Sequence, residues 1–357
     1  MKNIEELIKY LPEEYESQAK SSGAIQRVRE IKNAKDLMLL CLLYLYKGLS
    51  LLEVSVYASL EKIAEISNVN FMKRFAKCGE WFRIIALKLE FAEKVGYRKP
   101  SLFDVYRIIA VDASDIIQKG ALKVEYHLHY AYDIFNMRTV EYKFTTNKVG
   151  ETLKNFVTFK SGDIVLADRM YGTMTSILHC IENGADYIFR LKHKAFMLYD
   201  EAGRELKLNE KLLKATESES VDFTAYFKKG KKLMPVRICA IKKDSEAIEK
   251  NKIRTKKLES RKQMQFSDES KFMNNYIVVA TSLPSNIPSA DILELYRYRW
   301  QIELFFKRAK SLLQLGNLPN KKEENILVWL DGKMLCALLV ELIQSKINFS
   351  PKEHFES

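Results

Sequence analysis

Cysteine and histidine are scarce in this chain, and the few that occur are scattered. The 357 residues include five cysteines without a Cys-x-x-Cys pair and five histidines without metal-ligand spacing. A disulfide framework and a structural zinc site are therefore not expected, and the sequence fits a reducing compartment. His127 and His129 alternate in a strand-like segment, where we expect a structural role for both.

Long apolar segments are missing as well. The longest, residues 37–46, has ten residues between charged flanks, whereas a membrane-spanning helix needs about 20. The opening Met-Lys-Asn-Ile-Glu-Glu lacks the apolar stretch of a signal peptide. We therefore expect a cytoplasmic protein without a membrane partner.

Acidic residues are fewer than basic residues. Lys and Arg total 58 against 46 for Asp and Glu, which gives a formal net charge of +12. Hydrophobic residues make up 47% and charged residues 29%, a globular balance that excludes a disordered or collagen-like chain. The positive excess favours a polyanionic partner, such as nucleic acid or an anionic membrane surface. The length allows two or three domains.

The first hundred residues are typical of helices. Residues 34–46 and 75–95 carry apolar residues at spacings of three and four. Ser50 and Glu53 form a capping-box pattern, which predicts a helix that begins directly after Ser50. Residues 67–70 predict a break between two helices, and three basic residues follow. This arrangement fits a helix-turn-helix variant or an ordinary helical subdomain with a solvated basic face, and periodicity alone favours the second.

A different pattern begins near residue 100 and predicts a mixed α/β domain. The expected elements are strands over residues 105–117, 124–135 and 139–145, a short helix over 151–159, a buried strand over 164–167, a helix over 173–183 and a strand over 187–191. Residues 136–138 suit a hairpin turn between the second and third strands. Three antiparallel strands followed by helix, strand, helix and strand is the order of a ribonuclease-H-like domain, although other mixed sheets begin in the same way.

The next segment is strongly basic. Residues 190–275 hold 22 Lys and Arg and 13 Asp and Glu, which is most of the positive excess of the chain. The segment contains strand-like pieces over 220–227 and 234–241 and a charged helix over 246–265, and a buried strand over 276–282 follows it. We interpret residues 193–275 as an insertion. A charge run is usually a solvated face, but this concentration of charge favours contact with a phosphate backbone.

One helix, predicted over residues 288–316, carries a row of polar side chains. The members of the row are Tyr296, Arg299, Glu303 and Lys310. At 100° per residue they fall within an arc of about 60°. An adjacent apolar stripe consists of Leu295, Ile302, Phe306 and Leu313. The helix would pack by this stripe and present one carboxylate among three groups suited to phosphate, with a solvated salt-bridge face as the alternative.

This row resembles the Tyr-Arg-Glu-Lys signature of bacterial insertion-sequence transposases, in the large group named after insertion sequence four. Residue types and spacing agree throughout Tyr296-x2-Arg299-x3-Glu303-x6-Lys310. Two motifs at predicted strand ends resemble the Asp motifs of the family, Val111-Asp112-Ala113-Ser114 and Ala167-Asp168-Arg169-Met170-Tyr171-Gly172. Residues 22–27 and 43–50 also resemble N-terminal regions of this family, so the resemblance extends over about residues 20–345.

The resemblance implies a DDE transposase with a ribonuclease-H-like core. Asp112, Asp168 and Glu303 would be its catalytic and metal-binding carboxylates. In-line phosphoryl transfer is served by two divalent ions held by carboxylates, here Mg²⁺ with Mn²⁺ as the alternative.

Three other acidic residues compete for these roles. Asp115 lies three residues after Asp112 and would face the other side of a continuous strand. Asp163 precedes its strand and would lie at the wrong end. Nothing around Asp133 matches the motif.

The same resemblance assigns residues to DNA contact. Those implied to touch phosphates near the cleaved bond are Tyr296, Arg299 and Lys310. Arg169 of the second Asp motif is a further candidate for DNA binding. The family can flip a base near the transposon end, so an aromatic stacking partner is expected. Trp300 and Tyr276 are the candidates, with core packing as the alternative for both.

The implied function is transposition. Such a protein binds terminal inverted repeats, cleaves double-stranded DNA at the transposon ends and joins those ends to target DNA, with a hairpin step between. Two ends must meet, so the resemblance implies a dimer in a synaptic complex, associated with the nucleoid when bound to DNA. The alternatives are a catalytically idle, domesticated DNA-binding relative, a structure-specific nuclease and a helical interaction protein.

The predicted fold class is α/β. It combines a ribonuclease-H-like catalytic core with a helical N-terminal domain and a basic, strand-containing insertion before the last catalytic helix. The predicted divisions are a helical DNA-binding region over residues 1–100, the core over 101–192, the insertion over 193–275, the rest of the core with the catalytic helix over 276–318 and a helical region over 319–357.

Overall fold

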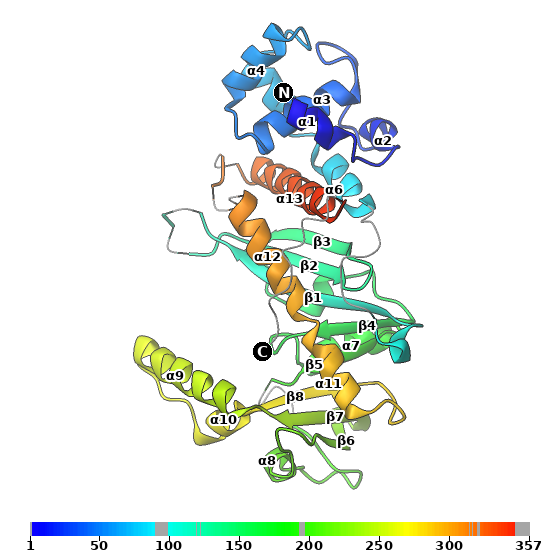
Figure 1. Cartoon of the computed structure of the whole chain (residues 1–357), viewed down its shortest axis with the longest axis vertical. Coiled ribbons are helices and arrows are strands. Elements are labelled where there is room, and N and C mark those ends of the chain that lie inside the picture. Colours follow the sequence, from blue (N-terminus) through cyan, green and yellow to red (C-terminus); the bar gives the residue numbers. More distant parts are fainter. Residues whose placement is uncertain are drawn as a thin grey trace.

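A long mixed sheet runs through the molecule, with the N-terminal helices at one end (Figure 1). The computed structural model describes residues 2–89, 99–118, 120–121, 123–192, 197–313, 315, 317–319 and 322–346. Within these residues, no helix is long and apolar enough to cross a membrane. All five cysteines are buried and free, as expected from their scatter.

Six helices precede the sheet in the described part of the chain. They are α1 (Lys2–Ile8), α2 (Tyr15–Ser21), α3 (Ala34–Leu45), α4 (Leu51–Leu60), α5 (Asn68–Phe75) and α6 (Gly79–Lys88). The predicted capping box opens α4, because Ser50 Oγ accepts from the Glu53 backbone N–H at 3.2 Å and the Glu53 carboxylate accepts from the Ser50 N–H at 2.7 Å.

Two helix boundaries differ from the prediction. Ser67 caps α5 by accepting from the backbone N–H of Asn70 at 3.3 Å, so residues 68–70 begin a helix instead of separating two. The helix predicted over residues 75–95 is interrupted between α5 and α6, and its last six residues lie outside the described chain. Phe75 and Phe82 meet in the same core, with ring centroids 5.8 Å apart, so the apolar pattern continues across the corner.

The C-terminal helix α13 (Glu323–Lys346) packs against α3 and α6 and not only against the sheet (Figure 1). The contact is close at Gly332, where a Cβ atom would lie 2.4 Å from Leu45 Cδ1 and 3.1 Å from Phe82. A residue without a side chain is needed there because any larger one would push the helices apart. Segments separated by more than 200 residues therefore share one core.

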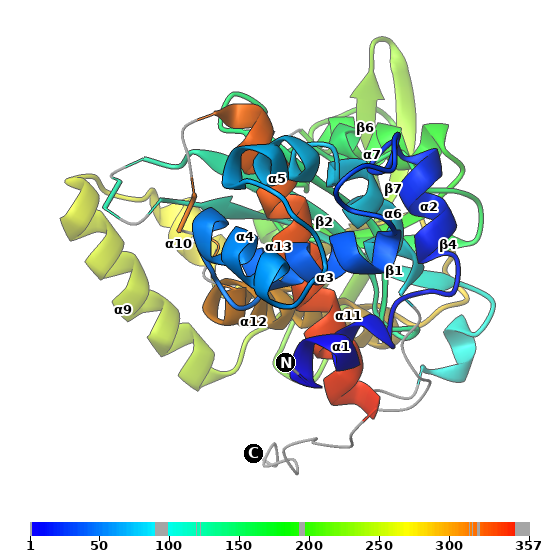
Figure 2. The same ribbon diagram turned by 90° about the horizontal axis from the view of Figure 1, so that it is seen from above.

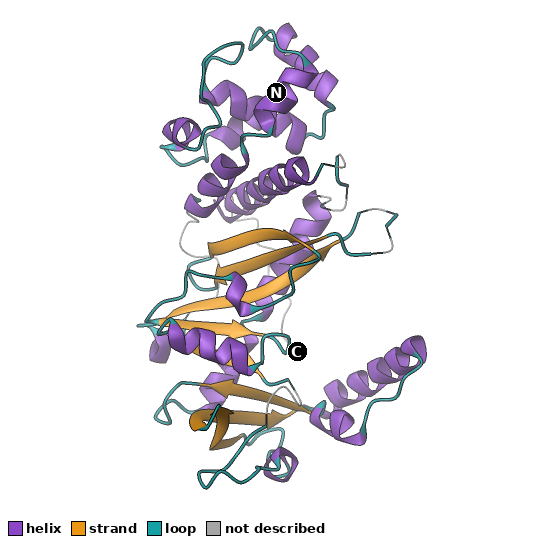
Figure 3. Cartoon of the chain, turned by 180° about the vertical axis from the view of Figure 1, so that it is seen from behind, coloured by secondary structure: helices purple, strands orange, loops and turns teal. Residues whose placement is uncertain are grey.

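Eight strands form one sheet in the order β3-β2-β1-β4-β5-β8-β7-β6 (Figure 3). Their bounds are β1 Arg107–Ile116, β2 Tyr126–Asp133, β3 Arg138–Thr146, β4 Asp163–Ala167, β5 Asp186–Arg190, β6 Val221–Lys229, β7 Lys232–Lys242 and β8 Tyr276–Thr281. β1, β4 and β5 are parallel, and the remaining neighbours are antiparallel. This mixed α/β arrangement fits the predicted ribonuclease-H-like core.

Both faces of the central strands are buried. Ile108 and Ala110 of β1 point into a core shared with the N-terminal helices and α13, whereas Ile109 and Val111 point into a second core under α7 (Met174–Glu182). All five residues of β4 are buried, as the apolar run predicts. Thr173 caps α7 and Gly184 follows it in the left-handed region at φ 69°, which confirms both predicted ends.

The short helix predicted over residues 151–159 is wrong. The chain makes only a 3₁₀ turn, η2 (Leu153–Asn155), and then runs extended. The reason is a contact with β3, because the Glu141 carboxylate accepts hydrogen bonds from the backbone N–H groups of Val157 (3.0 Å) and Thr158 (3.3 Å). These bonds hold the segment against the sheet edge.

The basic segment adds strands to the same sheet. β6 and β7 form a hairpin that pairs with β8, and the connections contain α8 (Leu208–Leu212), α9 (Ser245–Lys262) and α10 (Asp268–Met273). α11 (Ser289–Arg297) then packs on β7 and α12 (Trp300–Leu313) on β1. The chain thus returns along the sheet to its centre (Figure 1).

Candidate active site

Asp112 and Asp168 occupy neighbouring positions on two parallel strands. Val111 of β1 pairs with Ala167, the last residue of β4, so each aspartate is the next residue after this pair. Asp168 follows the carboxyl end of β4, the place where α/β proteins put their functional side chains. Asp112 is not at the strand end that the sequence predicted, because β1 pairs with β2 and continues to Ile116. The register of β1 and β4 still brings the two predicted aspartates together.

The surroundings of Asp112 disfavour its negative charge. The Asp112 side chain is 17% exposed, and burial raises its pKa to about 7, with the charges of Asp168 and Glu303 adding to the effect. The Ala113 N–H, which donates to Asp112 at 2.8 Å, and the nearby Arg299 partly oppose this rise. Asp168 accepts from the Met170 N–H at 2.8 Å. Such a pair favours a bound cation.

Arg299 lies between two of the predicted carboxylates. Its guanidinium is 3.9 Å from Asp112 Oδ2 and hydrogen-bonded to Glu303 Oε1, four residues along the chain. The arginine side chain is 14% exposed, whereas that of Glu303 is 45% exposed. Arg299 thus neutralises the carboxylates from the helix side.

The helix predicted over residues 288–316 is not continuous. It divides into α11 and α12 at Tyr298 and Arg299, and its predicted end at Gly316 lies outside the described residues. The Arg299 N–H donates to the Tyr296 carbonyl at 3.1 Å, and the Ile302 N–H to the Arg299 carbonyl at 3.2 Å. These bonds span three residues, so the chain tightens into a 3₁₀ turn where the helix passes the aspartates.

The other two members of the polar row lie on either side of this turn. Tyr296 is buried, and its ring centroid is 5.9 Å from the Arg299 guanidinium carbon. Partial burial lowers the pKa of Lys310, and the negative charges of Asp115 and Asp112 oppose that change. Despite the break in the helix, Arg299, Glu303 and Lys310 lie within electrostatic range of Asp112, and Tyr296 lies within range of Asp168.

The two candidate stacking residues differ in accessibility. Trp300 is 47% exposed at the start of α12 and can receive a base. Tyr276 is 5% exposed and packs against Phe272 with ring centroids 5.1 Å apart, so its role is core packing. Arg169 is held by a 2.8 Å hydrogen bond to the Asn274 side chain.

Two cations that the sequence analysis did not single out lie at the same sheet edge. Arg190 ends β5, and Lys243 directly follows β7, which runs parallel to β5 because both are antiparallel to β8. Arg190 forms no ion pair with a described residue, and its Nε has no hydrogen-bond partner there. Arg190 is half-buried, and the nearby Asp168 charge compensates it only in part, so this position favours an anion from outside.

The positive charges of Arg190, Arg169 and Lys243 repel one another. Burial lowers the pKa of Arg190, and the charge of Arg299 adds to this. Burial and Arg190 together lower the pKa of Arg169 to about 10. Burial, Arg190 and Arg169 lower the pKa of Lys243 to about 8. Their position after apolar runs was visible in the sequence, but the direction of β7 was not.

Gly172 lets the second Asp motif reach this cluster. A Cβ atom at Gly172 would lie 2.0 Å from the Arg190 carbonyl oxygen. The loop that follows Asp168 therefore passes directly against the end of β5, which only glycine permits.

The competing acidic residues have other positions. Asp163 forms two 2.8 Å hydrogen bonds with Arg107 at the opposite end of β4. Asp133 accepts from Asn136 in the hairpin turn. Asp115 lies on the other face of β1, 2.9 Å from His127 Nδ1. In the described chain, Asp115, His127 and Glu151 are the one set of three potential ligand groups whose atoms all lie within 4.8 Å.

The two histidines of β2 differ in their surroundings. His129 is fully buried and its Nε2 lies 2.9 Å from Thr145 Oγ1, while burial lowers its pKa to about 4. This is the structural role expected of it. His127, by contrast, belongs to the acidic set with Asp115 and could contribute to a cation site.

Comparisons with known proteins agree with this geometry. Residues 104–339 match the family model described as a transposase DDE domain, which spans the sheet and both predicted Asp motifs. The chain is 30% identical over 352 residues to the transposase for insertion sequence element IS421 of Escherichia coli, with 96% of this chain and 93% of that protein covered. InsL of insertion sequence element IS186A, from E. coli strain K12, has the same identity and coverage over 351 residues.

A more distant relative shares only part of its length. The transposase for insertion sequence element IS231B of Bacillus thuringiensis is 26% identical over 199 residues, covering 51% of this chain and 41% of that protein. The family model, together with nearly full-length relatives at 30% identity, establishes the assignment. The chain therefore belongs to the family of insertion-sequence DDE transposases and is a DNA transposase.

Proposed function

We propose that this transposase binds the terminal inverted repeats of its element, cleaves DNA at the repeat ends and transfers the freed strands to target DNA. Asp112, Asp168 and Glu303 are the catalytic carboxylates. The observation that carries the proposal is the register of β1 and β4, which places Asp112 beside Asp168, with Glu303 close enough for its charge to raise the pKa of Asp112.

The family implies a divalent metal, and the residues present fit one. The three groups offer only oxygen donors, the kind that Mg²⁺ prefers, with Mn²⁺ as the alternative. The raised pKa of Asp112 supports such a site, because a bound cation would stabilise the charged carboxylate. When bound, two such ions would supply Lewis-acid activation of the attacking oxygen and stabilisation of the leaving oxygen.

The surrounding cations bind the substrate phosphates. Arg190 Nε has no hydrogen-bond partner among the described residues, and the buried Tyr296 hydroxyl lies within range of Arg190 and Arg299. Arg299 pairs with the carboxylates and can present its planar fork to a phosphate. With Lys310 and Arg169, these residues hold the backbone next to the cleaved bond, and exposed Trp300 stacks on a displaced base.

The N-terminal helices supply the sequence-selective contacts, and two protomers act together. Backbone contacts at the sheet edge carry no base code, so the repeat must be read elsewhere in the protein. The helix pair α4 and α5 offers exposed polar residues at the start of its second helix. A dimer follows from the need to bring two ends together.

The decisive experiment is cleavage of a duplex that carries the sequences flanking the gene. With Mg²⁺ we expect nicking at the repeat end and, with target DNA present, a joined product, whereas Ca²⁺ supports binding without cleavage. Cleavage without any joined product would favour a structure-specific nuclease. Binding without cleavage would favour a catalytically idle relative.

A further inference from the structure

Helix α9 has no buried residue, although it is 18 residues long. It stands away from the sheet in both views (Figures 1 and 2). A helix in a globular protein is normally stabilised by packing an apolar face. The sequence of α9 instead contains seven Lys and Arg and three Glu. This composition favours a helix that binds a negatively charged partner.

Four of the seven cations form a stripe. On a helical projection with Lys250 at 0°, Arg254, Lys257 and Arg261 fall at about 40°, 340° and 20°. The stripe is about 16 Å long, at 1.5 Å per residue. The remaining cations point elsewhere, with Lys252, Lys256 and Lys262 at about 200°, 240° and 120°.

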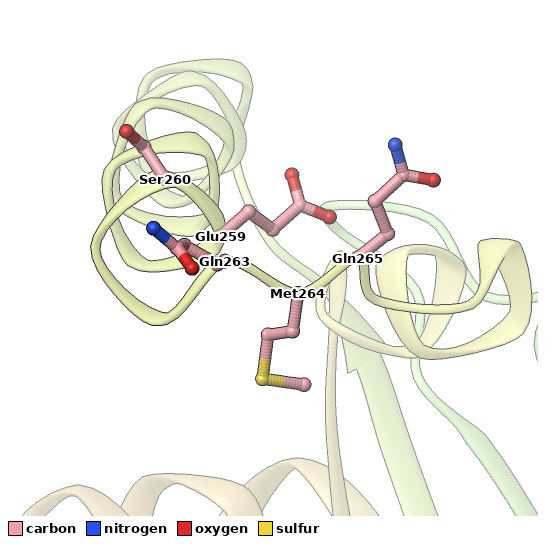
Figure 4. A pocket seen from close by; sticks show the side chains of 5 residues that line it. All are labelled: Glu259, Ser260, Gln263, Met264 and Gln265. Atoms are coloured by element: carbon pink, nitrogen blue, oxygen red, sulfur yellow. The ribbon is translucent and has the colours of Figure 1, made fainter.

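The stripe is not neutralised along most of its length. Lys250 pairs with Glu246 at 2.5 Å, but Arg254, Lys257 and Arg261 form no ion pair with any residue that the structure describes. The glutamate nearest the end of the stripe, Glu259, turns away from it and accepts from the Phe266 N–H at 2.8 Å. Figure 4 shows its carboxylate directed toward the segment that carries Gln265, opposite to Ser260.

α9 leaves the sheet at the edge that holds the active site. It begins three residues after the end of β7, which is parallel to β5. The ends of β4, β5 and β7 therefore present Asp168, Arg190 and Lys243 in sequence along one edge. Positive groups continue from the acidic site to the base of α9.

We propose that α9 is an arm that holds the phosphate backbone of duplex DNA as it leaves the acidic site. The inference rests on the proposed function, because it assumes that DNA occupies the sheet edge. Repeated cations about one helical turn apart match a polyanion. The stripe lacks aromatic residues, which single-stranded nucleic acid would need for stacking. Its contacts are therefore to backbone and independent of sequence.

The test compares two triple variants of the full-length protein. R254Q/K257Q/R261Q removes the unpaired part of the stripe. K252Q/K256Q/K262Q removes the same number of charges from the other faces of the same helix. Glutamine keeps helix propensity close to that of lysine and arginine, and circular dichroism checks that both variants retain the wild-type helix content.

The measurement is fluorescence anisotropy with a random-sequence duplex, titrated at several salt concentrations. Each phosphate contact contributes about 0.9 to the slope of log affinity against log salt. In R254Q/K257Q/R261Q we expect the magnitude of this slope to be smaller than in the wild type by about 2 to 3. In the control variant K252Q/K256Q/K262Q it should fall by less than about 1. Equal salt slopes for the two variants would contradict the proposal that α9 holds DNA by this stripe. An equal loss of binding to single-stranded DNA would overturn its assignment to duplex.

The measurements distinguish a failure of the proposed function from a failure of the proposed role of α9. If the wild type cleaves repeat-ended DNA and the two triple variants bind alike, only the arm is wrong. If the wild type binds no duplex at all, the proposed function is wrong and the arm with it.

Discussion

Asp112 holds a carboxylate where negative charge is unfavourable. It is mostly buried beside Asp168, within range of Glu303, and only Arg299 and one backbone N–H oppose the rise in its pKa. A cluster of this kind is costly for folding and is explained by a task that requires it. Two predictions follow from this arrangement at the scale of single residues.

Removing any of the three carboxylates should abolish cleavage and spare binding. We expect Asp112→Asn, Asp168→Asn and Glu303→Gln each to lower the cleavage rate at least about a thousandfold, because the residues act as one unit. Binding of repeat-ended duplex should stay within a few-fold, as these groups do not recognise DNA. Gel-based cleavage and anisotropy measure the two effects.

The matched control is Asp115→Asn, on the same strand but the opposite face. It should cleave at a rate close to that of the wild type. A reversal, with Asp115→Asn inactive and Asp112→Asn active, would move the metal site to the Asp115, His127 and Glu151 set.

Arg299 should compete with divalent ions for the same carboxylates. Its guanidinium lies 3.9 Å from Asp112, so Arg299→Ala removes a nearby positive charge. We expect the affinity for Mn²⁺ without DNA to rise roughly tenfold, which corresponds to about 1.4 kcal/mol, while cleavage at saturating DNA falls. Isothermal titration calorimetry measures the first effect. Arg297→Ala is the control, because Arg297 is exposed at the end of α11. Weaker metal binding in Arg299→Ala would contradict this role.

At the scale of elements, one ion pair joins α13 to α6. Asp331 of α13, with 4% of its side chain exposed, lies 2.9 Å from Arg83 of α6. Burial raises the pKa of Asp331 to about 6, and the attraction of Arg83 only partly opposes it. The unfolded chain therefore releases this proton near pH 4 and the folded chain near pH 6.

This difference predicts a pH-dependent stability. Between about pH 4 and pH 6 the folded state holds a proton that the unfolded state has lost, so stability from this group falls as pH rises. A shift of about two units corresponds to about 3 kcal/mol. The free energy of unfolding of the wild type minus that of Asp331→Asn should fall by up to this amount across the window. Chemical denaturation at a series of pH values measures it.

Glu80→Gln is the control for this window. Glu80 also pairs with Arg83, at 3.3 Å, but its side chain is 56% exposed. The variant should keep the pH dependence of the wild type. If the free energy of unfolding changed with pH equally in the wild type and in Asp331→Asn, the Asp331 carboxyl would not titrate in this window.

At the scale of the whole molecule, the proposed function assigns phosphate contacts to the sheet edge and sequence-selective contacts to the N-terminal helices. The edge carries cations suited to phosphates, and α5 presents exposed Asn70 in its first turn and exposed Lys73 in its last. Because α3 and α6 cover α13, removal of the N-terminal helices would also expose a core. Substitutions at the surface of α5 are therefore the cleaner test of selectivity.

The double variant Asn70→Ala, Lys73→Ala should lose selectivity for the repeats. A lost base contact costs about 1–3 kcal/mol, so the ratio of affinities for repeat-ended and random duplex should fall about tenfold. Competition binding at fixed salt measures this ratio. Equal weakening for both duplexes would mean that α5 contacts only backbone, or that another element reads the repeat.

Local patterns were sufficient for much of the fold and site. The capping box at Ser50, the buried run of β4 and the ends of α7 depend on neighbours in the sequence, so their residues predict them. Asp168 could be found because it follows an apolar strand, and Asp112 because it follows an apolar run, although that run lies inside β1. The spacing of the polar row survives in the structure because the residues are close in the chain.

Long-range contacts decided what the sequence could not. The helix breaks at Arg299 where it crosses the aspartates, and the segment after η2 is extended because Glu141 of β3 binds its backbone. Arg190 and Lys243 meet only because β7 runs parallel to β5 through an intervening antiparallel strand. The residue types of this protein determined its chemistry, since charge and hydrogen-bonding capacity are local. Which of those groups face one another was decided by strand direction and packing, which depend on residues far apart in the chain.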